Sequence, residues 1–125
     1  SQTSVRRTAS DYAWGITTTG TGRNALNPIV FPLHKIAVES GLAITLSVWV
    51  YRTTTSLTAQ LFVGKRQLAG LSADQTDTAS GSINTWEQLS VTFTVIEPGV
   101  VESALLVYGA ATGSVYIDDA DWSQV

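Results

Sequence analysis

The sequence predicts an all-β protein, an antiparallel β-sandwich with jelly-roll topology, from three observations. β-Branched and aromatic residues are plentiful while Glu and Lys are scarce, which is typical of half-buried pleated surface. Several short segments alternate between apolar and polar side chains, with Gly- and Pro-containing turns between them. No segment repeats apolar residues at helical spacing over more than about two turns. Eight or nine strands in a single domain spanning 1–125 are therefore expected.

The segment 42–52, LAITLSVWVYR, is the clearest predicted strand. Its even-numbered positions are all aliphatic up to Val50, whereas its odd-numbered positions are polar and then aromatic. A strand points successive side chains to opposite faces of its sheet, so the aliphatic set belongs in the core. Trp49 and Tyr51 are consequently predicted on the outer face.

Two other segments alternate in the same way. Residues 86–95 are predicted to place Leu89, Val91, Phe93 and Val95 inward, with Gln88 facing outward. Residues 58–64 are predicted to place Ala59, Leu61 and Val63 inward, with Gln60 and Phe62 facing outward.

The rest of the chain is assigned from turns and weaker patterns. Turn sequences at 39–41 and 97–99 delimit predicted strands, which are 29–38, 100–108 and 114–122. Pro32 lies inside the first of these, which indicates an edge strand or a bulge. The weaker strand candidates are 5–9, 13–18 and 68–73, and 74–82 is predicted to be a loop.

Composition excludes several classes of function. The chain has no cysteine and one histidine, which excludes disulfides, thiol nucleophiles and sites that need two imidazoles. A net charge of -3 argues against a nucleic-acid partner. No apolar run approaches the roughly 18 residues of a membrane-spanning helix, so no membrane insertion is expected. The absence of Met, including an initiator, predicts a chain cut from a larger product.

Catalytic motifs are also missing. There is no G-x-S-x-G nucleophile elbow, and Gly20-Thr21-Gly22 lacks the Lys-Ser/Thr of a phosphate loop. His34 has apolar neighbours and is predicted to be a hydrogen-bonded core or rim residue. The protein is therefore expected to bind a ligand and not to be an enzyme.

Five segments in order carry a resemblance to known proteins: the turn at Gly41, then LSVWVYR, NTWEQLSVTFTV, EPGV and GSVYIDDADW. In this order, over about residues 31–122, they resemble the jelly-roll carbohydrate-binding modules and their galactose-binding-like relatives. The pattern TW-x-x-L-x-x-TFT followed by YIDD is equally similar to domains of bacteriophage virion proteins. The resemblance implies either a glycan-binding module or a virion structural domain, located extracellularly or on a virion surface.

The aromatic residues are the main binding candidates. Exposed Trp and Tyr rings stack on the flat C–H faces of sugars, and amide side chains bind the hydroxyls at the edges. The predicted ligand-binding residues are Trp49, Tyr51, Gln60, Phe62 and Gln88. The same rings are also typical anchors of a subunit interface, or pack within the fold, and both alternatives stay open. The expected partner is thus a polysaccharide or cell-surface glycan, neighbouring virion subunits, or a second copy in a homo-oligomer.

Trp86 and Trp122 are predicted to be structural residues at strand ends.

An acidic cluster near the C-terminus raises the question of calcium. Modules of the resembled family often hold a structural Ca²⁺ with a carboxylate from a first strand of sequence Asn-x-x-Phe-Glu, which this chain lacks. Asp118 is nevertheless the candidate ligand for a structural calcium, although no cofactor is required. Alternation predicts Asp119 and Asp121 on the face of Val115 and Ile117. The structural alternative is that these carboxylates cap a strand end at the rim, where they meet backbone N–H groups or Arg6 and Arg7.

Overall fold

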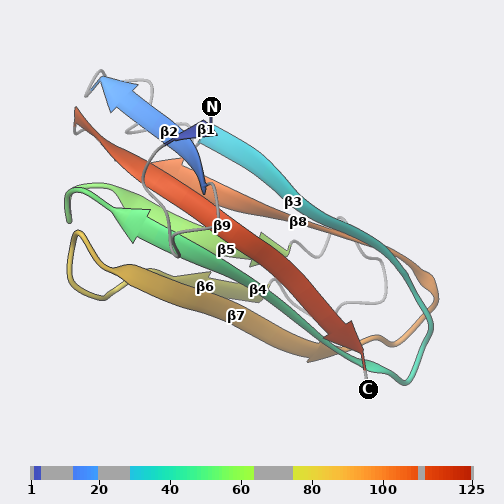
Figure 1. The fold of residues 1–125 in the computed structure, drawn as a ribbon. Coiled ribbons are helices and arrows are strands. Elements are labelled where there is room, and N and C mark those ends of the chain that lie inside the picture. The colour runs from blue at the N-terminus through green and yellow to red at the C-terminus, as the bar shows by residue number, and fades with distance from the viewer. Residues whose placement is uncertain (1, 4–12, 20–28, 64–74, 110–111, 125) are drawn as a thin grey trace.

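A computed structural model describes residues 2–3, 13–19, 29–63, 75–109 and 112–124. These residues form nine strands in two antiparallel sheets that stack as a β-sandwich (Figure 1). Successive strands mostly alternate between the two sheets, as the jelly-roll prediction required. No helix within the described ranges is long and apolar enough to cross a bilayer.

The two sheets contain five and four strands. In spatial order, the five-stranded sheet consists of β1 (Gln2–Thr3), β2 (Ala13–Thr19), β9 (Thr112–Gln124), β4 (Ala43–Arg52) and β7 (Trp86–Thr94). The four-stranded sheet consists of β3 (Ile29–Val38), β8 (Gly99–Tyr108), β5 (Thr58–Val63) and β6 (Gln75–Thr78).

The core lies between the sheets and is built from the predicted inner faces. Along β4, every second residue is buried, which confirms the assignment made from alternation. The buried apolar side chains come from both sheets and are at most 9% exposed, among them Ile44, Leu46, Val48, Leu61, Leu89, Val91, Leu105 and Val107. Burial of these side chains is the main source of stability.

The strand predictions that fall on described residues are confirmed with one correction. Pro32 lies in β3, which is an edge strand, and a register shift occurs between Pro32 and Lys35. The predicted edge strand and the predicted bulge are therefore both confirmed. The loop predicted over 74–82 is wrong in part, because 75–78 forms β6 and pairs with β5. The sequence QTDT shows no apolar alternation because both faces of this short edge strand are polar. The candidates 5–9 and 68–73 lie outside the described residues.

Side chains also cover the exposed backbone near β7, which is the edge of the five-stranded sheet. The carboxylate of Asp77 on β6 accepts a hydrogen bond from the backbone N–H of Ser90 at 2.9 Å. Glu87 accepts hydrogen bonds from the N–H groups of Ser80 and Gly81 at 3.0 and 2.9 Å. Such contacts protect a sheet edge from pairing with another chain.

Candidate functional site

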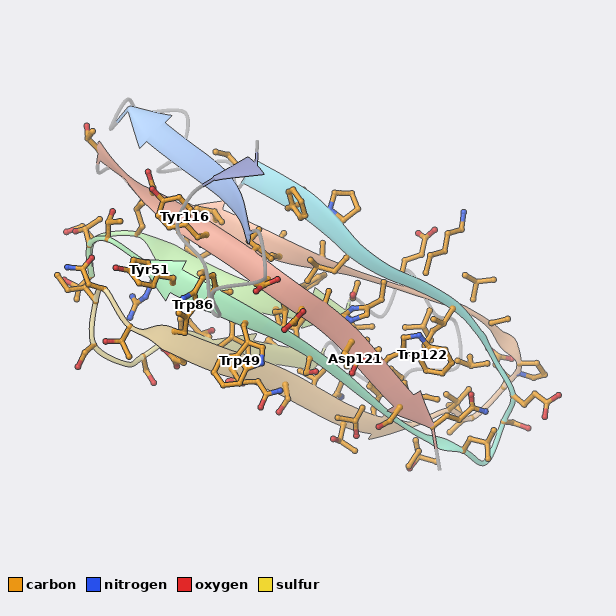
Figure 2. All side chains as sticks on the ribbon, viewed as in Figure 1. Trp49, Tyr51, Trp86, Tyr116, Asp121 and Trp122 are labelled. Carbon is orange, nitrogen blue, oxygen red and sulfur yellow. The ribbon has the colours of Figure 1, made fainter. Side chains whose placement is uncertain are left out.

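A row of three aromatic rings crosses the outer face of the five-stranded sheet. Tyr51 on β4 lies directly opposite Tyr116 on β9 and Trp86 on β7. The ring centroids of Tyr51 and Trp86 are 5.5 Å apart and those of Tyr51 and Tyr116 are 5.8 Å apart. Interplanar angles of 60° and 63° give the tilted arrangement that aromatic pairs prefer. Figure 2 shows the three side chains together at one end of the sheet.

The row contains three aromatic rings, of which the sequence predicted only Tyr51 as a binding residue. Neighbouring strands lie about 4.8 Å apart, so a row over three strands spans roughly 10 Å. Trp86 does begin its strand, as predicted for a structural residue, but its ring also belongs to this outer face. Tyr116 was not predicted as a site residue. Only the strand register, which places Tyr116 and Trp86 on either side of Tyr51, reveals the group.

The next row along the same face is polar around a single indole. Trp49 pairs with Gln88 on β7 and with Asp118 on β9, which places the predicted residues Trp49 and Gln88 side by side. Two residues before Trp49 on β4, and on the same face, Ser47 lies opposite Asp121. A pocket of about 400 Å³ opens here, lined by Ser47, Trp49, Gln88, Asp119, Ala120 and Asp121.

A β-bulge in β9 shapes this pocket. Ser47 pairs with Asp121 and Trp49 with Asp118, so three steps on β9 match two on β4. The extra residue reverses the alternation, and Asp119 takes a φ of 46°. The prediction that Asp119 and Asp121 share the face of Val115 is therefore wrong. The bulge returns Asp121 to the outer face beside Ser47, and Asp119 lines the same outer-face pocket.

The carboxylates of the bulge accept backbone hydrogen bonds, as one part of the structural alternative predicted. The other predicted partners, Arg6 and Arg7, lie outside the described residues. The N–H of Asp119 donates to Oδ1 of Asp118 at 2.8 Å, and the N–H of Trp122 donates to Oδ1 of Asp121 at 2.8 Å. These bonds hold the strand in its bulged shape and position the acidic side chains at the pocket.

His34 anchors the bulge from the other sheet. Its Nε2–H donates to the carbonyl of Asp121 at 2.7 Å, and the hydroxyl of Ser103 donates to its Nδ1. Its backbone N–H donates to the same hydroxyl at 3.2 Å. Burial lowers the pKa of His34 below its usual value, and this effect exceeds the opposing influence of the Asp121 carbonyl and carboxylate. The prediction of a hydrogen-bonded core or rim histidine is confirmed.

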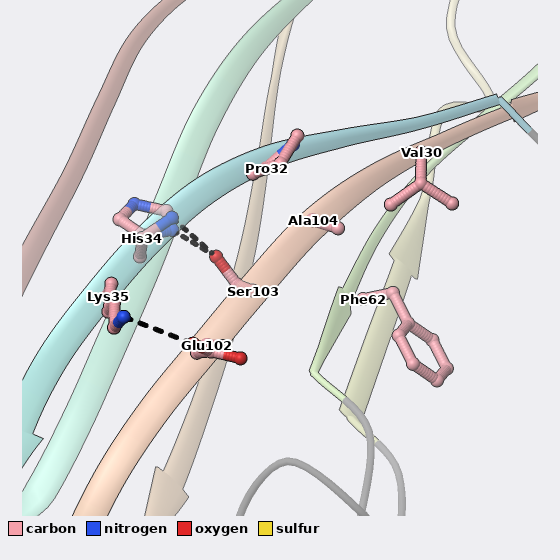
Figure 3. Close-up of a pocket in the computed structure, with 8 residues that line it drawn as sticks. All are labelled: Val30, Pro32, His34, Lys35, Phe62, Glu102, Ser103 and Ala104. Carbon is pink, nitrogen blue, oxygen red and sulfur yellow. Dashed lines mark hydrogen bonds and ion pairs between the residues drawn. The ribbon is translucent and has the colours of Figure 1, made fainter.

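Two predicted binding residues lie on the opposite side of the molecule. Gln60 and Phe62 do face outward from β5, but β5 belongs to the four-stranded sheet. Gln60 donates to Thr78 at 3.0 Å, and Phe62 lines an apolar groove with Val30 and Pro32 (Figure 3). The five predicted residues therefore do not form one site. Alternation shows which side chains point outward but not from which sheet.

The candidate calcium ligand Asp118 lies in β9. Ca²⁺ takes six to eight oxygen ligands at short distance. Within the described part of the chain, no three His, Asp or Glu side chains converge in a way that would hold a metal ion. Calcium binding at Asp118 stays a prediction from the resemblance.

Comparison with known proteins finds similarity in structure only. No protein-family model matches the chain, and no curated protein matches its sequence. The structure of Family 16 Carbohydrate Binding Module-2 matches with a TM-score of 0.58 and 13% identity, covering 90% of this chain and 76% of that one. TmCBM61, solved in complex with beta-1,4-galactotriose, matches with a TM-score of 0.60 and 14% identity, covering 91% and 70%.

These matches define the class of fold. The protein is a two-sheet β-sandwich with the fold of carbohydrate-binding modules. At this level of identity the similarity extends to the fold and not to individual binding residues. Neither of the two structures is a virion protein, so the resemblance to virion domains stays a prediction.

Proposed function

We propose that the protein is a non-catalytic glycan-binding module that binds a polysaccharide or cell-surface glycan on the outer face of its five-stranded sheet. The observation that carries this proposal is the pocket beside Trp49. An indole, an amide from Gln88, a hydroxyl from Ser47 and two carboxylates line one pocket, and the Tyr116–Tyr51–Trp86 row adjoins it.

The chemistry of this face suits a sugar chain. A pyranose presents an apolar C–H face to an aromatic ring and hydroxyls at its rim, so it needs a ring and several hydrogen-bonding groups close together. Trp49 supplies the ring, and Gln88 and Ser47 supply donors and acceptors beside it. The aromatic row extends the apolar surface by about 10 Å across the strands. A ligand of more than one sugar unit would contact both parts.

The similarity in fold also supports a glycan as the ligand. TmCBM61 has been solved with beta-1,4-galactotriose, and its fold is similar to that of this protein. The similarity favours an oligosaccharide as the class of ligand, while the residues proposed to bind it come from the geometry of this chain.

The arrangement of acidic groups favours binding over hydrolysis. Glycoside hydrolases place two carboxyl groups on either side of the bond that they break. Here Asp119 and Asp121 both come from β9, and the pocket residue on the other flanking strand, β7, is the neutral Gln88. No pair of carboxylates therefore faces a ligand from opposite sides within the described pocket.

Trp49→Ala is expected to weaken glycan binding at least about tenfold while the fold is retained. Truncation of an anchoring aromatic residue costs about 2 kcal/mol, and 1.4 kcal/mol is tenfold in affinity. A glycan array identifies the ligand, and isothermal titration with that ligand measures the change. Thermal unfolding checks that the outward-facing substitution leaves the core intact. Unchanged affinity in the folded variant would contradict the proposal.

Two control variants locate the site. Trp122→Ala removes the same ring from β9, but Trp122 is 44% exposed, lies opposite Leu46 on the other face of the sheet, and does not line the pocket. Phe62→Ala removes the ring of the four-stranded sheet. Both are expected to bind the glycan as the wild type does. If Phe62→Ala abolished binding and Trp49→Ala did not, the glycan would bind to the opposite sheet.

A further inference from the structure

Asp121 connects the Trp49 pocket to the other sheet of the sandwich. Its exposed side chain lines the pocket on the outer face of the five-stranded sheet, opposite Ser47. Its carbonyl oxygen accepts a hydrogen bond of 2.7 Å from Nε2–H of His34, which lies on β3 in the four-stranded sheet. The backbone of a pocket residue is therefore held by a side chain from the opposite sheet.

The imidazole of His34 is itself held at both ring nitrogens. The hydroxyl of Ser103 on β8 donates to Nδ1, and the same hydroxyl accepts the backbone N–H of His34 at 3.2 Å (Figure 3). The backbone of Ser47, which pairs with Asp121, also interacts with the ring. His34 is buried, and a buried polar side chain whose partners are all in place rigidifies its surroundings.

The position of the Asp121 side chain depends on the shape of an irregular part of β9. The bulge interrupts the ladder with β4 just before Asp121. The described pairing of β2 with β9 extends from Thr112 to Ile117, and Asp121 lies beyond it. The N–H of Trp122 fixes the carboxylate relative to its own strand, and the hydrogen bond from His34 fixes this part of the strand relative to the other sheet.

We propose, on the basis of the proposed function, that His34 is a positioning residue of the Trp49 pocket. Its Nε2–H holds the Asp121 carbonyl and thereby keeps the Asp121 carboxylate where it accepts hydrogen bonds from sugar hydroxyls. A polar group that is already in place raises affinity, because the ligand does not have to order it on binding. Ordering of one side chain corresponds to a change of about twofold to tenfold in affinity.

Two amide variants of His34 test this role, because each retains a different half of the imidazole. The amide of Gln reaches about as far as Nε2 and can donate to Asp121, whereas the amide of Asn reaches only as far as Nδ1 and can bond to Ser103. His34→Asn is expected to bind the oligosaccharide identified by the glycan array at least about fivefold more weakly than the wild type, and His34→Gln within about twofold of it. Isothermal titration measures both affinities. A role in stability alone would not separate the two variants, because each loses one buried hydrogen bond.

Val38→Ala is the control for destabilisation of the sandwich. Val38 is buried on the same strand as His34, roughly 13 Å further along β3, and does not line the pocket. Its truncation is expected to lower the free energy of unfolding and to leave the affinity for the glycan unchanged. If Val38→Ala weakened binding as much as His34→Asn does, general loosening of the fold would be the cause, and the positioning role would be overturned.

A double-mutant cycle with Asp121→Ala tests whether His34 acts through the Asp121 side chain. Asp121→Ala removes the carboxylate but keeps the carbonyl that His34 holds. In this background, His34→Asn is expected to change the affinity by less than about twofold, because the group that it positions is already absent. A further loss of about fivefold in the same background would overturn the route through Asp121.

Ser103→Ala keeps the test decisive if His34→Asn does not fold. It retains the histidine, removes the hydroxyl that orients the ring, and is expected to weaken glycan binding about twofold. Wild-type affinity in folded His34→Asn, or in Ser103→Ala where His34→Asn does not fold, overturns the positioning role and leaves the glycan-binding function in place, which Trp49→Ala tests separately. Failure of the chain to bind any glycan overturns the proposed function and the role of His34 with it.

Discussion

Leu46→Ala is expected to lower the free energy of unfolding by about 2 to 5 kcal/mol. Leu46 is 0% exposed and occupies the inner face of β4, paired with Val91 on β7 and Trp122 on β9. Its truncation loses the free energy of transferring the side chain from water and leaves a cavity in a close-packed interior. Because domains of this size are stable by about 5 to 15 kcal/mol, the loss is a large fraction of the total. Urea denaturation followed by tryptophan fluorescence measures it.

Ser47→Ala is the matched control for this substitution. Ser47 is the next residue on the same strand, but its side chain points to the outer face. Its replacement is expected to change the free energy of unfolding by less than about 0.5 kcal/mol. If Leu46→Ala cost no more than Ser47→Ala, the inner face of β4 would not be packed as described.

His34→Gln is expected to lower the free energy of unfolding by about 1 to 3 kcal/mol at pH 8. His34 is buried and connects β3 to Ser103 on β8 and to the carbonyl of Asp121 on β9. Glutamine retains one amide for the Asp121 carbonyl, but it does not reproduce the geometry of the two ring nitrogens, so one buried polar group loses its partner.

The effect of this substitution should depend on pH. Burial lowers the pKa of His34 in the folded protein below the value of about 6.5 that applies in the unfolded chain. As the pH falls below about 6.5, the unfolded chain binds a proton that folded His34 does not. The stability contributed by neutral His34 is therefore complete above that pH and declines below it, by at most about 1.4 kcal/mol per pH unit, until folded His34 is itself protonated.

The measurement compares denaturation of the wild type and His34→Gln at pH 8 and pH 5. The difference between the two proteins is expected to be largest at pH 8 and smaller at pH 5. A difference that grew on acidification would mean that the fold stabilises the charged imidazole, contrary to the burial of His34. The comparison cancels the titration of the carboxylates that both proteins share.

Much of the sandwich follows from local alternation. The inward and outward positions of β4, β5 and β7 were all correctly predicted, because a strand turns successive side chains to opposite faces whatever it pairs with. This is why Trp49 and Gln88 could be placed on an outer surface in advance. The same rule failed at β6, whose polar residues carry no apolar alternation.

The candidate site depended on information that alternation does not contain. Phe62 alternates as cleanly as Tyr51, yet it lies on the other sheet, since strand order arises from contacts between distant segments. The bulge in β9 moved Asp121 to the outer face, and no single residue in IDDADW predicts where an extra residue enters the ladder.

The sequence therefore predicts the inner and outer faces of most strands and the turns that separate them, because these features depend on neighbouring residues. It also excludes thiol and paired-histidine chemistry, because those depend on composition. The tertiary structure decided that Tyr116 and Trp86 flank Tyr51, that Asp121 joins Trp49 and Gln88 at one pocket, and that His34 supports it from the other sheet. These arrangements depend on the pairing of strands far apart in the chain, which the packing of both sheets around one core determines.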